Sequence, residues 1–425
     1  MMARLFYSLL FYLAMPLIWL RLVWRSRRQP EYLRHLGERL GFYPPSAGAS
    51  WIWLHAVSVG ETRAAEPLVE ALLAAYPSHR LLLTHMTPTG RAAASELLRR
   101  HPQRLAQAYL PYDLPGACAR FFDHFQPSVG LLMETEIWPN LIATAVRRRR
   151  PIALVNARLS ARSQRGYSRL LPLIEPALAS LDAVAAQSPA DAARLQAIGA
   201  KRVTVVGNLK FDATPAPEKL ALGAHWRQAI GARPVLLAAS TRDGEEALLL
   251  DALASLAIAD LLLVLVPRHP QRFAEVARLL TTRRLVYCRR GELALPSRQT
   301  QVWLGDSMGE MAAYYALADL AMIGGSWLPF GGQNLIEAAA CACPVLIGPH
   351  MFNFEQASAD AVQAGAACRV ADASSAARLV DELLADQRRL LAMRDAARVF
   401  SQRHQGATAR TVALIGQLMA QPAER

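Results

Sequence analysis

Short apolar runs alternate with amphipathic stretches along the chain after residue 50. Most of the runs lack the alternation of polar and apolar residues that marks a half-exposed strand, so they predict strands buried in a mostly parallel sheet. The intervening segments, such as 63–75 and 188–198, carry apolar residues at helical spacing. This βαβ series predicts a doubly wound α/β domain. Its expected strands are WIWLHAV, LLLTHM, LAQAYLPY, VGLLMET, PIALVNA, DAVAAQ and RVTVVG.

The pattern breaks after Gly207, where DATPAPEK (212–219) has two prolines and few apolar residues, as an interdomain linker does. A second βαβ series then begins, which predicts a second Rossmann-like domain. Its expected strands are PVLLAAS, LLLVLVP, RLVYC, TQVWLG, DLAMIGG, CPVLIG and AACRVAD. The expected parts are an N-terminal domain (29–211), a linker (212–225), a C-terminal domain (226–400) and a C-terminal helix (401–425), for which packing back on the N-terminal domain is one arrangement.

Residues 1–28 form a separate hydrophobic segment with a basic flank. No charge occurs from Leu5 to Leu20, and four arginines follow before residue 29. A spanning helix needs about 20 apolar residues, a length that this run reaches only if it continues past Arg21 to Trp24. No small-residue cleavage site follows, so we expect an uncleaved anchor with the main body in the cytoplasm. Pro16 leaves open a kinked helix that lies in the membrane interface.

The charge balance favours an anionic partner. The formal net charge is +13, which suits nucleic acid, an acidic membrane or a phosphorylated substrate. The basic run at 147–150 lacks interleaved aromatic residues, which argues against single-stranded nucleic acid. The five cysteines form no CxxC pair, so neither a disulfide framework nor a zinc site is expected. No metal-ligand motif is present, and we expect neither a metal nor a cofactor.

The stretch IGGSWLPFGGQNLIEAAACACPVLIGP (323–349) is the most informative part of the second series. Its glycines allow a loop to approach a ligand closely, and a helix expected from Asn334 to Cys341 would offer free N–H groups to a phosphate. Glu337, one turn into that helix, suits two vicinal ribose hydroxyls. The plain alternative is a glycine-rich turn with a Glu that complements the helix dipole. Arg268 and the turns GDSMGEM and AASTRDGEE follow other strands, so we expect a nucleotide site at this edge.

The first series has carboxylates where its expected strands end. Glu61 follows such a strand in LHAVSVGETRAAE and begins a helix, where it either complements the helix dipole or performs chemistry. We expect this helix position to keep Glu61 ionised. Glu134 and Glu136 are two positions apart in METE, and we expect at most one of them to face the site. Lys210 comes directly before the expected linker.

Taken in order behind the N-terminal hydrophobic segment, the motifs resemble those of a known family. They are HAVSVGE, THMTPTG, YLPYD, METEIWPN, NARLSARS, GNLKFD, VPRHP, MGEM and GGQNLIEAAACACPVLIGPHMFNFE. This set is similar to that of the bacterial 3-deoxy-D-manno-octulosonic acid (Kdo) transferases of lipopolysaccharide assembly. The resemblance implies a GT-B glycosyltransferase, with two Rossmann-like domains facing across a cleft, on the cytoplasmic face of the inner membrane.

The resemblance also implies the reaction and its residues. Kdo would move from CMP-Kdo to the 6′-hydroxyl of a tetraacyl lipid A precursor (lipid IVA), with inversion and without a metal or nucleic-acid partner. Glu61 matches the family's general base, and Glu134 and Lys210 match residues that stabilise the transition state. Leu335 stands where other members have Pro, and a backbone contact there should survive. The CMP-binding positions would be Pro267, Arg268, Met308, Gly309, Glu310, Asn334, Leu335, Ile336 and Glu337.

Three alternatives remain at this point. A GT-B membrane transferase that uses a UDP-sugar and a lipid carrier shares the architecture. A nucleotide-sugar epimerase also shares it but needs no anchor, and the hydrophobic segment argues against that reading. A non-catalytic membrane binding module is the third. No motif sets the number of Kdo residues added, the acylation of the acceptor or the oligomeric state.

Overall fold

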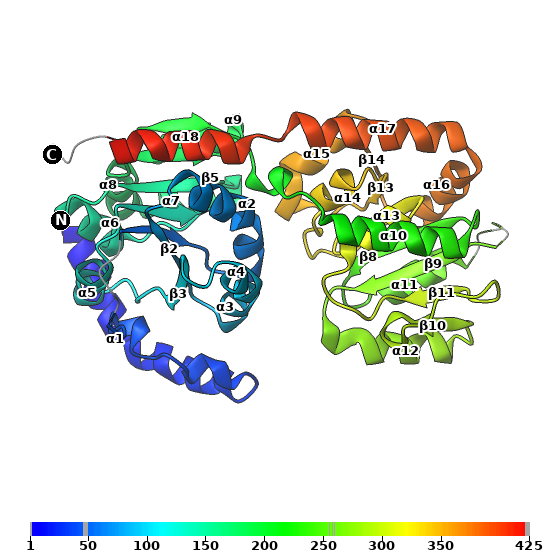
Figure 1. Ribbon diagram of the computed structural model, residues 1–425, viewed down its shortest axis with the longest axis horizontal. Coiled ribbons are helices and arrows are strands. Elements are labelled where there is room, and N and C mark those ends of the chain that lie inside the picture. Colours follow the sequence, from blue (N-terminus) through cyan, green and yellow to red (C-terminus); the bar gives the residue numbers. More distant parts are fainter. Residues whose placement is uncertain (1, 46–49, 255, 257, 259, 421–425) are drawn as a thin grey trace. The chain divides into compact units, whose positions relative to one another are not determined.

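A computed structural model describes residues 2–45, 50–254, 256, 258 and 260–420 (Figure 1). The chain divides into two compact units, which we describe separately. Unit 1 comprises Met1–Ala213 with Gln405–Arg425, and unit 2 comprises Thr214–His404. Met1 and residues 421–425, which belong to the expected anchor and C-terminal helix, lie outside the described residues. Both units are α/β with a parallel sheet, which confirms the expected fold class.

Unit 1 is built on a seven-stranded parallel sheet in the order β3-β2-β1-β4-β5-β6-β7. Each strand lies within one of the seven predicted apolar runs, except that β2 begins one residue earlier, at Arg80. Its central strands are buried on both faces, as their lack of polar alternation predicts. The strands are β1 (Trp51–His55), β2 (Arg80–His85), β3 (Leu105–Tyr109), β4 (Val129–Met133), β5 (Ile152–Ala157), β6 (Ala183–Ala186) and β7 (Val203–Val205).

Helices cover both faces of this sheet. One core joins it to α2 (Val59–Ala75) and α18 (Ala407–Ala420), and the other joins it to α5 (Pro115–Phe125), α6 (Pro139–Arg147) and α8 (Leu171–Ala179). Several helices of unit 1 begin with a proline, whose fixed φ suits a first helical turn. The remaining elements are η1 (Pro30–Leu33), η2 (Glu38–Leu40), α3 (Pro88–Ala93), α4 (Ser95–Arg100), α7 (Ala161–Ser168), α9 (Pro189–Ala197) and η3 (Leu209–Asp212).

Unit 2 has a second seven-stranded parallel sheet, in the order β10-β11-β9-β8-β12-β13-β14. Its strands again lie within the predicted runs, except that β8 and β10 each extend one residue further, to Thr241 and Arg289. They are β8 (Val235–Thr241), β9 (Leu262–Pro267), β10 (Tyr287–Arg289), β11 (Val302–Leu304), β12 (Leu320–Ile323), β13 (Val345–Ile347) and β14 (Ala367–Arg369). The helices are α10 (Pro217–Ile230), α11 (Glu245–Leu253), η4 (Pro270–Arg272), α12 (Phe273–Thr282), η5 (Arg290–Glu292), α13 (Met311–Leu317), α14 (Ile336–Ala340), η6 (Phe352–Phe354), α15 (Glu355–Gln363), α16 (Ala373–Ala385) and α17 (Gln387–Arg403).

The segment 212–225, expected to be a linker, is mostly helical. Pro217 begins α10, because a proline at the first helical position loses no backbone hydrogen bond. Trp226 anchors this helix in unit 2, with its ring centroid 5.0 Å from that of Trp303. After α17 the chain returns to unit 1, where α18 (red in Figure 1) places Ile415 and Leu418 in the core.

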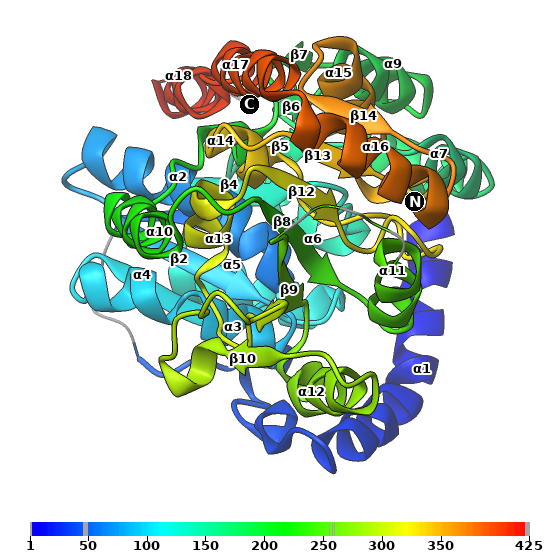
Figure 2. The same ribbon diagram turned by 90° about the vertical axis from the view of Figure 1, so that its right-hand side faces the viewer.

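The N-terminal segment is one helix, α1 (Met2–Ser26), that continues through Pro16 (Figure 2). It is long and apolar enough, by length and composition, to be a candidate membrane span. One face nevertheless packs on unit 1, where Leu22 is buried beside Tyr32 and Tyr112. On the same face, the Ser8 hydroxyl lies 3.0 Å from the Asn140 amide nitrogen, which donates to it. The opposite face exposes large apolar side chains, namely Leu5, Phe6, Leu9, Leu10, Leu13, Leu17 and Leu20.

Gly130 in β4 tests how tightly the unit 1 sheet is packed. A Cβ at this position would lie 2.7 Å from the Trp53 ring, so we expect Gly130→Ala to lower the free energy of unfolding by about 1–3 kcal/mol. Gly166 in α7 is the matched control, because a Cβ there meets nothing within 4 Å. We expect Gly166→Ala to be neutral or stabilising by up to about 1 kcal/mol. Equal melting temperatures for the two variants in thermal unfolding would contradict this packing.

Candidate active site

Glu61 lies in the first turn of α2, just after β1 ends at His55. Its carboxylate accepts a hydrogen bond from the Val57 N–H at 2.8 Å and another from the Ser58 hydroxyl at 3.1 Å. Ser58 is the N-cap residue and Glu61 has the spacing of a capping box, but the Ser58 hydroxyl bonds to Glu61 instead of capping a backbone N–H. The start of the helix thus holds the carboxyl group at the carboxyl edge of the sheet.

The pKa of Glu61 is raised from its ordinary value of 4.5 to about 7. Burial is the largest cause, and the negative charges of Glu134 and Glu136 add to it against the two hydrogen bonds. The expectation that the helix position keeps Glu61 fully ionised is therefore wrong. Desolvation and like charge outweigh the favourable helix end, which leaves a carboxyl group that exchanges its proton near neutral pH.

Glu134 forms a buried ion cluster beside Glu61. One carboxylate oxygen lies 3.1 Å from Lys210 Nζ, and the other lies 2.8 Å from Arg158 Nε. Burial raises the pKa of Glu134, but the two cations outweigh it and hold the pKa below its ordinary value. Three residues from separate parts of unit 1 therefore meet in one charged group. The sequence predicted Glu134 and Lys210, but it did not predict that Arg158 pairs with Glu134.

Glu136 lies near this cluster, since its negative charge also raises the pKa of Glu61. That at most one carboxylate of METE faces the site stays a prediction. The alternation of a strand does not apply, because β4 ends at Met133 and Glu134 has a left-handed φ of 55°. Trp138 Nε1 donates to Glu136 at 2.7 Å, and His55 Nε2 lies 4.0 Å from it. Burial raises the pKa of Glu136 to about 7. The only signal for it in the sequence was its place two residues after Glu134.

Asn156 sets the backbone that carries Lys210. It is the second-last residue of β5, has a left-handed φ of 51° and is fully buried. Its Oδ1 accepts the Leu209 N–H at 3.1 Å, and Asn208 Oδ1 accepts the Lys210 N–H at 3.0 Å. Two asparagines thus fix the turn from which Lys210 reaches Glu134. Left-handed residues other than glycine are costly and are concentrated at functional sites.

In unit 2, Arg268 connects two of the expected nucleotide-binding segments. It follows Pro267, the last residue of β9, and its Nε donates to Gln333 Oε1 at 3.2 Å. Its backbone N–H donates to the Thr241 carbonyl after β8. The ends of β8 and β9 and the glycine-rich segment after β12 are therefore joined at the carboxyl edge of the sheet.

Met308, Gly309 and Glu310 form the turn between β11 and α13. Gly309 has a φ of 76°, and a Cβ there would meet nothing, so its backbone is open to a ligand. The Glu310 side chain is held in a two-bond ion pair with Arg290, at 3.1 and 3.0 Å. A ligand at this turn would therefore contact the backbone rather than the Glu310 carboxylate.

The helix expected from Asn334 to Cys341 is shorter than predicted, since α14 spans only Ile336–Ala340. The Asn334 side chain accepts the Ile336 N–H at 3.1 Å, so that donor is already used. Leu335 and Ile336 are each 1% exposed, so both residues are buried in this structure. The positive helix end expected here for a phosphate is therefore a single short turn.

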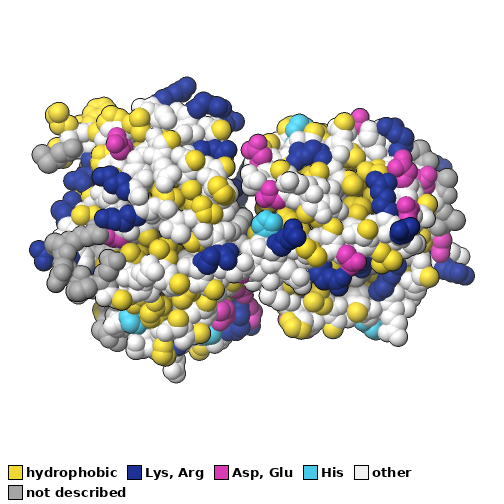
Figure 3. All heavy atoms as spheres, turned by 90° about the horizontal axis from the view of Figure 1, so that it is seen from above, with side chains coloured by type: hydrophobic (Ala, Val, Ile, Leu, Met, Phe, Trp, Pro, Cys, Tyr) yellow, Lys and Arg dark blue, Asp and Glu magenta, His cyan; other side chains and the backbone are white. Residues whose placement is uncertain are grey.

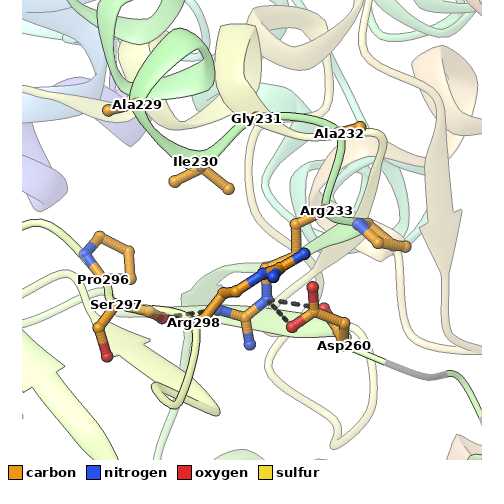
Figure 4. A pocket seen from close by; sticks show the side chains of 10 residues that line it. Ala229, Ile230, Gly231, Ala232, Arg233, Asp260, Pro296, Ser297 and Arg298 are labelled. Atoms are coloured by element: carbon orange, nitrogen blue, oxygen red, sulfur yellow. Dashed lines mark hydrogen bonds and ion pairs between the residues drawn. The ribbon is translucent and has the colours of Figure 1, made fainter.

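A cavity of about 430 Å³ in unit 2 lies at the opposite edge of the sheet, before β8 begins (Figure 4). Arg233 dominates its wall and donates to the backbone carbonyls of Asp260, Leu261, Ser297 and Thr300. These bonds hold together the loops that line the cavity. The cavity lies at the opposite edge of the sheet from the expected nucleotide-binding segments. Among the described residues, no three His, Cys, Asp or Glu side chains are grouped to hold a metal ion.

Comparison with known proteins places the chain in a family. Residues 34–213 match the family model described as 3-deoxy-D-manno-octulosonic-acid transferase, and residues 248–400 match glycosyl transferases group 1. A 3-deoxy-D-manno-octulosonic acid transferase of Bordetella pertussis is 47% identical over 412 residues, covering 93% of this chain and 95% of that protein. The chain belongs to the 3-deoxy-D-manno-octulosonic acid transferase family. The resemblance drawn from the motifs is confirmed.

Further relatives agree with this placement of the transferase. A 3-deoxy-D-manno-octulosonic acid transferase of Haemophilus influenzae is 38% identical and covers 84% of each chain. A glycosyltransferase structure from Rickettsia africae superposes with a TM-score of 0.62 at 14% identity, covering 88% of this chain and 100% of that one. At that identity the structural likeness shows the fold alone. Membership of a glycosyltransferase family confirms that the chain is an enzyme.

Glu61→Gln tests the electrostatics of the cluster through stability. Between pH 4.5 and about 7 the folded protein keeps a proton on Glu61 that the unfolded chain releases, so stability falls as the pH rises through this window. We expect Glu61→Gln to raise the free energy of unfolding by about 1–3 kcal/mol at pH 8 and to change little at pH 4.5. Thermal unfolding at both pH values measures this difference.

Glu66→Gln serves as the control for that experiment. Glu66 lies on the same helix in an exposed pair with Arg100, so its removal should not stabilise the protein at pH 8. A loss of stability in Glu61→Gln at pH 8 that equals the loss at pH 4.5 would contradict the raised pKa.

Proposed function

We propose that this transferase moves Kdo from CMP-Kdo to the 6′-hydroxyl of a tetraacyl lipid A precursor (lipid IVA), with inversion at the anomeric carbon. The observation that carries the proposal is the Glu61 carboxyl group, whose pKa is about 7 and which sits beside the ion-paired Glu134. Membership of the family supports the sugar. The acceptor position and the stereochemistry rest on the resemblance of the motifs.

Glu61 is the proposed general base. A sugar hydroxyl is a poor nucleophile, and a base with a pKa near the working pH removes its proton most effectively in the transition state. The hydroxyl oxygen then forms its bond to the anomeric carbon as the bond from that carbon to the CMP phosphate breaks. A direct displacement of this kind inverts the configuration, and the proton goes to Glu61.

Glu134 and Lys210 are proposed to stabilise the transition state. Their ion pair is held at 3.1 Å, and Arg158 supplies a second cation to the same carboxylate. With one carboxylate and two cations, the group of Glu134, Lys210 and Arg158 carries a formal charge of +1. Fixed charges aimed at a reacting centre stabilise developing charge without reorganising during the reaction.

Unit 2 is the proposed CMP-binding unit. Arg268 offers a cation for the departing phosphate, in place of a metal. The Gly309 turn offers open backbone, which fits recognition of a nucleotide by main-chain hydrogen bonds. In the segment from Asn334 to Glu337, these two end residues are the partly exposed ones. The full proposed set is Pro267, Arg268, Met308, Gly309, Glu310, Asn334, Leu335, Ile336 and Glu337.

We further propose that α1 lies in the cytoplasmic leaflet of the inner membrane rather than crossing it. Its inner face already contacts unit 1 through Leu22 and Ser8, and a spanning orientation would break those contacts. Its outer face is apolar and arginines flank it, as in interfacial helices that bind anionic lipid. On the face in Figure 3, Lys and Arg side chains are interspersed with hydrophobic and acidic ones. The formal net charge of +13 favours an anionic surface as a partner.

The catalytic proposal is tested by Glu61→Gln with purified protein, CMP-Kdo generated in situ and lipid IVA. We expect transfer to fall by about 10²- to 10⁴-fold, because the hydroxyl loses its base. Binding of CMP should stay within twofold, since unit 2 is unchanged, and Glu66→Gln should keep full activity.

Wild-type turnover of a UDP-sugar but not of CMP-Kdo would refute the donor. Unchanged transfer by Glu61→Gln would refute the base. Mass spectrometry of the product counts the Kdo residues added.

The membrane proposal is tested by placing charges on the outer face of α1. Leu13 and Leu17 are 67% and 69% exposed, so Leu13→Glu with Leu17→Glu should fold normally. We expect flotation with vesicles rich in anionic lipid to fall at least tenfold. Leu248→Glu, on an exposed position of α11, should not change it. Protection of the N-terminus from protease across sealed vesicles would show a spanning helix and contradict the interfacial one.

A further inference from the structure

The most completely bonded carboxylate in unit 2 belongs to Glu245, the first residue of α11. Its side chain is fully buried. Oε2 accepts the backbone N–H groups of Gly325 at 2.6 Å and Arg242 at 2.8 Å. Oε1 accepts those of Trp327 at 2.9 Å and Leu328 at 3.3 Å. Four backbone donors therefore converge on one internal anion.

Three of these donors come from the turn that follows β12. A run of backbone N–H groups that point to one centre is the arrangement by which glycine-containing turns bind phosphate. Here that centre is already filled by the chain's own carboxylate. The Gly325–Leu328 turn is therefore unavailable to an anionic ligand, even though its sequence suggests a phosphate loop.

The same turn carries the glycine-rich segment expected to meet the nucleotide. The Gly332 N–H donates to the Gly325 carbonyl at 2.7 Å, and the Gln333 N–H donates to the Gly324 carbonyl at 2.9 Å. Gln333 in turn accepts from Arg268 at 3.2 Å. A continuous set of hydrogen bonds therefore runs from Glu245 through the turn to Gln333 and Arg268.

Glu245 also fixes the segment after β8, through the Arg242 N–H. Thr241, next to Arg242, accepts the Arg268 N–H at 2.9 Å. The carboxylate thus joins the ends of β8 and β12, and both ends lead to Arg268. Because α11 begins at Glu245, its helix dipole adds a favourable field at the same point.

We propose that Glu245 is a positioning residue for the sugar-nucleotide donor, which acts by holding the glycine-rich segment and Arg268 in their binding arrangement. It does not touch the donor. The inference rests on the proposed function in one respect, the assignment of the donor nucleotide to unit 2. It also implies that the donor phosphate is bound by Arg268 and not by the turn after β12.

The test compares CMP binding by full-length purified Glu245→Gln, Glu245→Asp and wild-type protein in calorimetric titrations. In Glu245→Gln an amide NH₂ replaces one acceptor and opposes backbone N–H groups, so we expect CMP affinity to fall at least tenfold. Glu245→Asp keeps a carboxylate that is one methylene shorter, and it should lie between the other two. In kinetics, the KM for donor should rise by the same factor, with kcat and the KM for acceptor within threefold.

Asp319→Asn is the matched control in the same unit. The Asp319 carboxylate accepts the Val235 N–H at 2.9 Å and pairs with Arg227 at 3.0 Å, at the opposite edge of the sheet. It should lower the melting temperature as Glu245→Gln does but leave CMP affinity within twofold. Amide hydrogen exchange should quicken over 323–335 in Glu245→Gln and not in Asp319→Asn. Equal losses of CMP affinity in both variants, or wild-type affinity in Glu245→Gln, would overturn the proposal.

A wrong donor assignment would give a different result from a wrong role for Glu245. If the wild-type protein binds UMP and not CMP, the proposed donor is wrong, and the same variants measured with UMP decide the role of Glu245. If the wild type binds CMP and Glu245→Gln binds it equally well, the donor stands and the positioning role falls.

Discussion

The negative charge of a buried carboxylate must be balanced by adjacent cations or hydrogen-bond donors. Each unit of this chain is organised around one such carboxylate. In unit 1, Lys210 and Arg158 compensate Glu134, and this pairing fixes the loops after β4, β5 and β7. In unit 2, four backbone N–H groups compensate Glu245 and fix the turns after β8 and β12. Both carboxylates lie where parallel strands end, so their partners determine the shape of the candidate site.

The two ways of balancing a buried carboxylate have different chemical consequences. Side-chain cations leave Glu134 within a charged cluster, and its negative charge still raises the pKa of neighbouring Glu61. Backbone donors leave Glu245 sealed inside the protein. The arrangement at Glu134 shifts the pKa of Glu61, a group that can exchange protons, whereas the arrangement at Glu245 holds a loop in place. Glu61 is accordingly costly to ionise in the folded state, the kind of local instability that enzymes keep at reacting centres.

The fold followed from the sequence because parallel strands buried on both faces leave continuous apolar runs, and each of the fourteen strands matches such a run to within one residue. Motif order identified the family. The sequence could not give the pKa of Glu61, which depends on burial and on two carboxylates brought near by folding. Nor could it give the left-handed φ of Glu134, which breaks the strand alternation before Glu136. The helix at Pro217 was missed because prolines start helices as well as interrupt them.

The return of the chain to unit 1 has a consequence for synthesis. Ala407, Ile415 and Leu418 complete the core beneath the unit 1 sheet, although almost two hundred residues of unit 2 separate them from β7. The ribosome therefore releases every residue of unit 2 before unit 1 can close its core. Domains usually fold as units in the order of their synthesis. In this chain, unit 2 is therefore the first unit whose residues are all available for folding, whereas the core beside the candidate site is complete only after α18 has been synthesised.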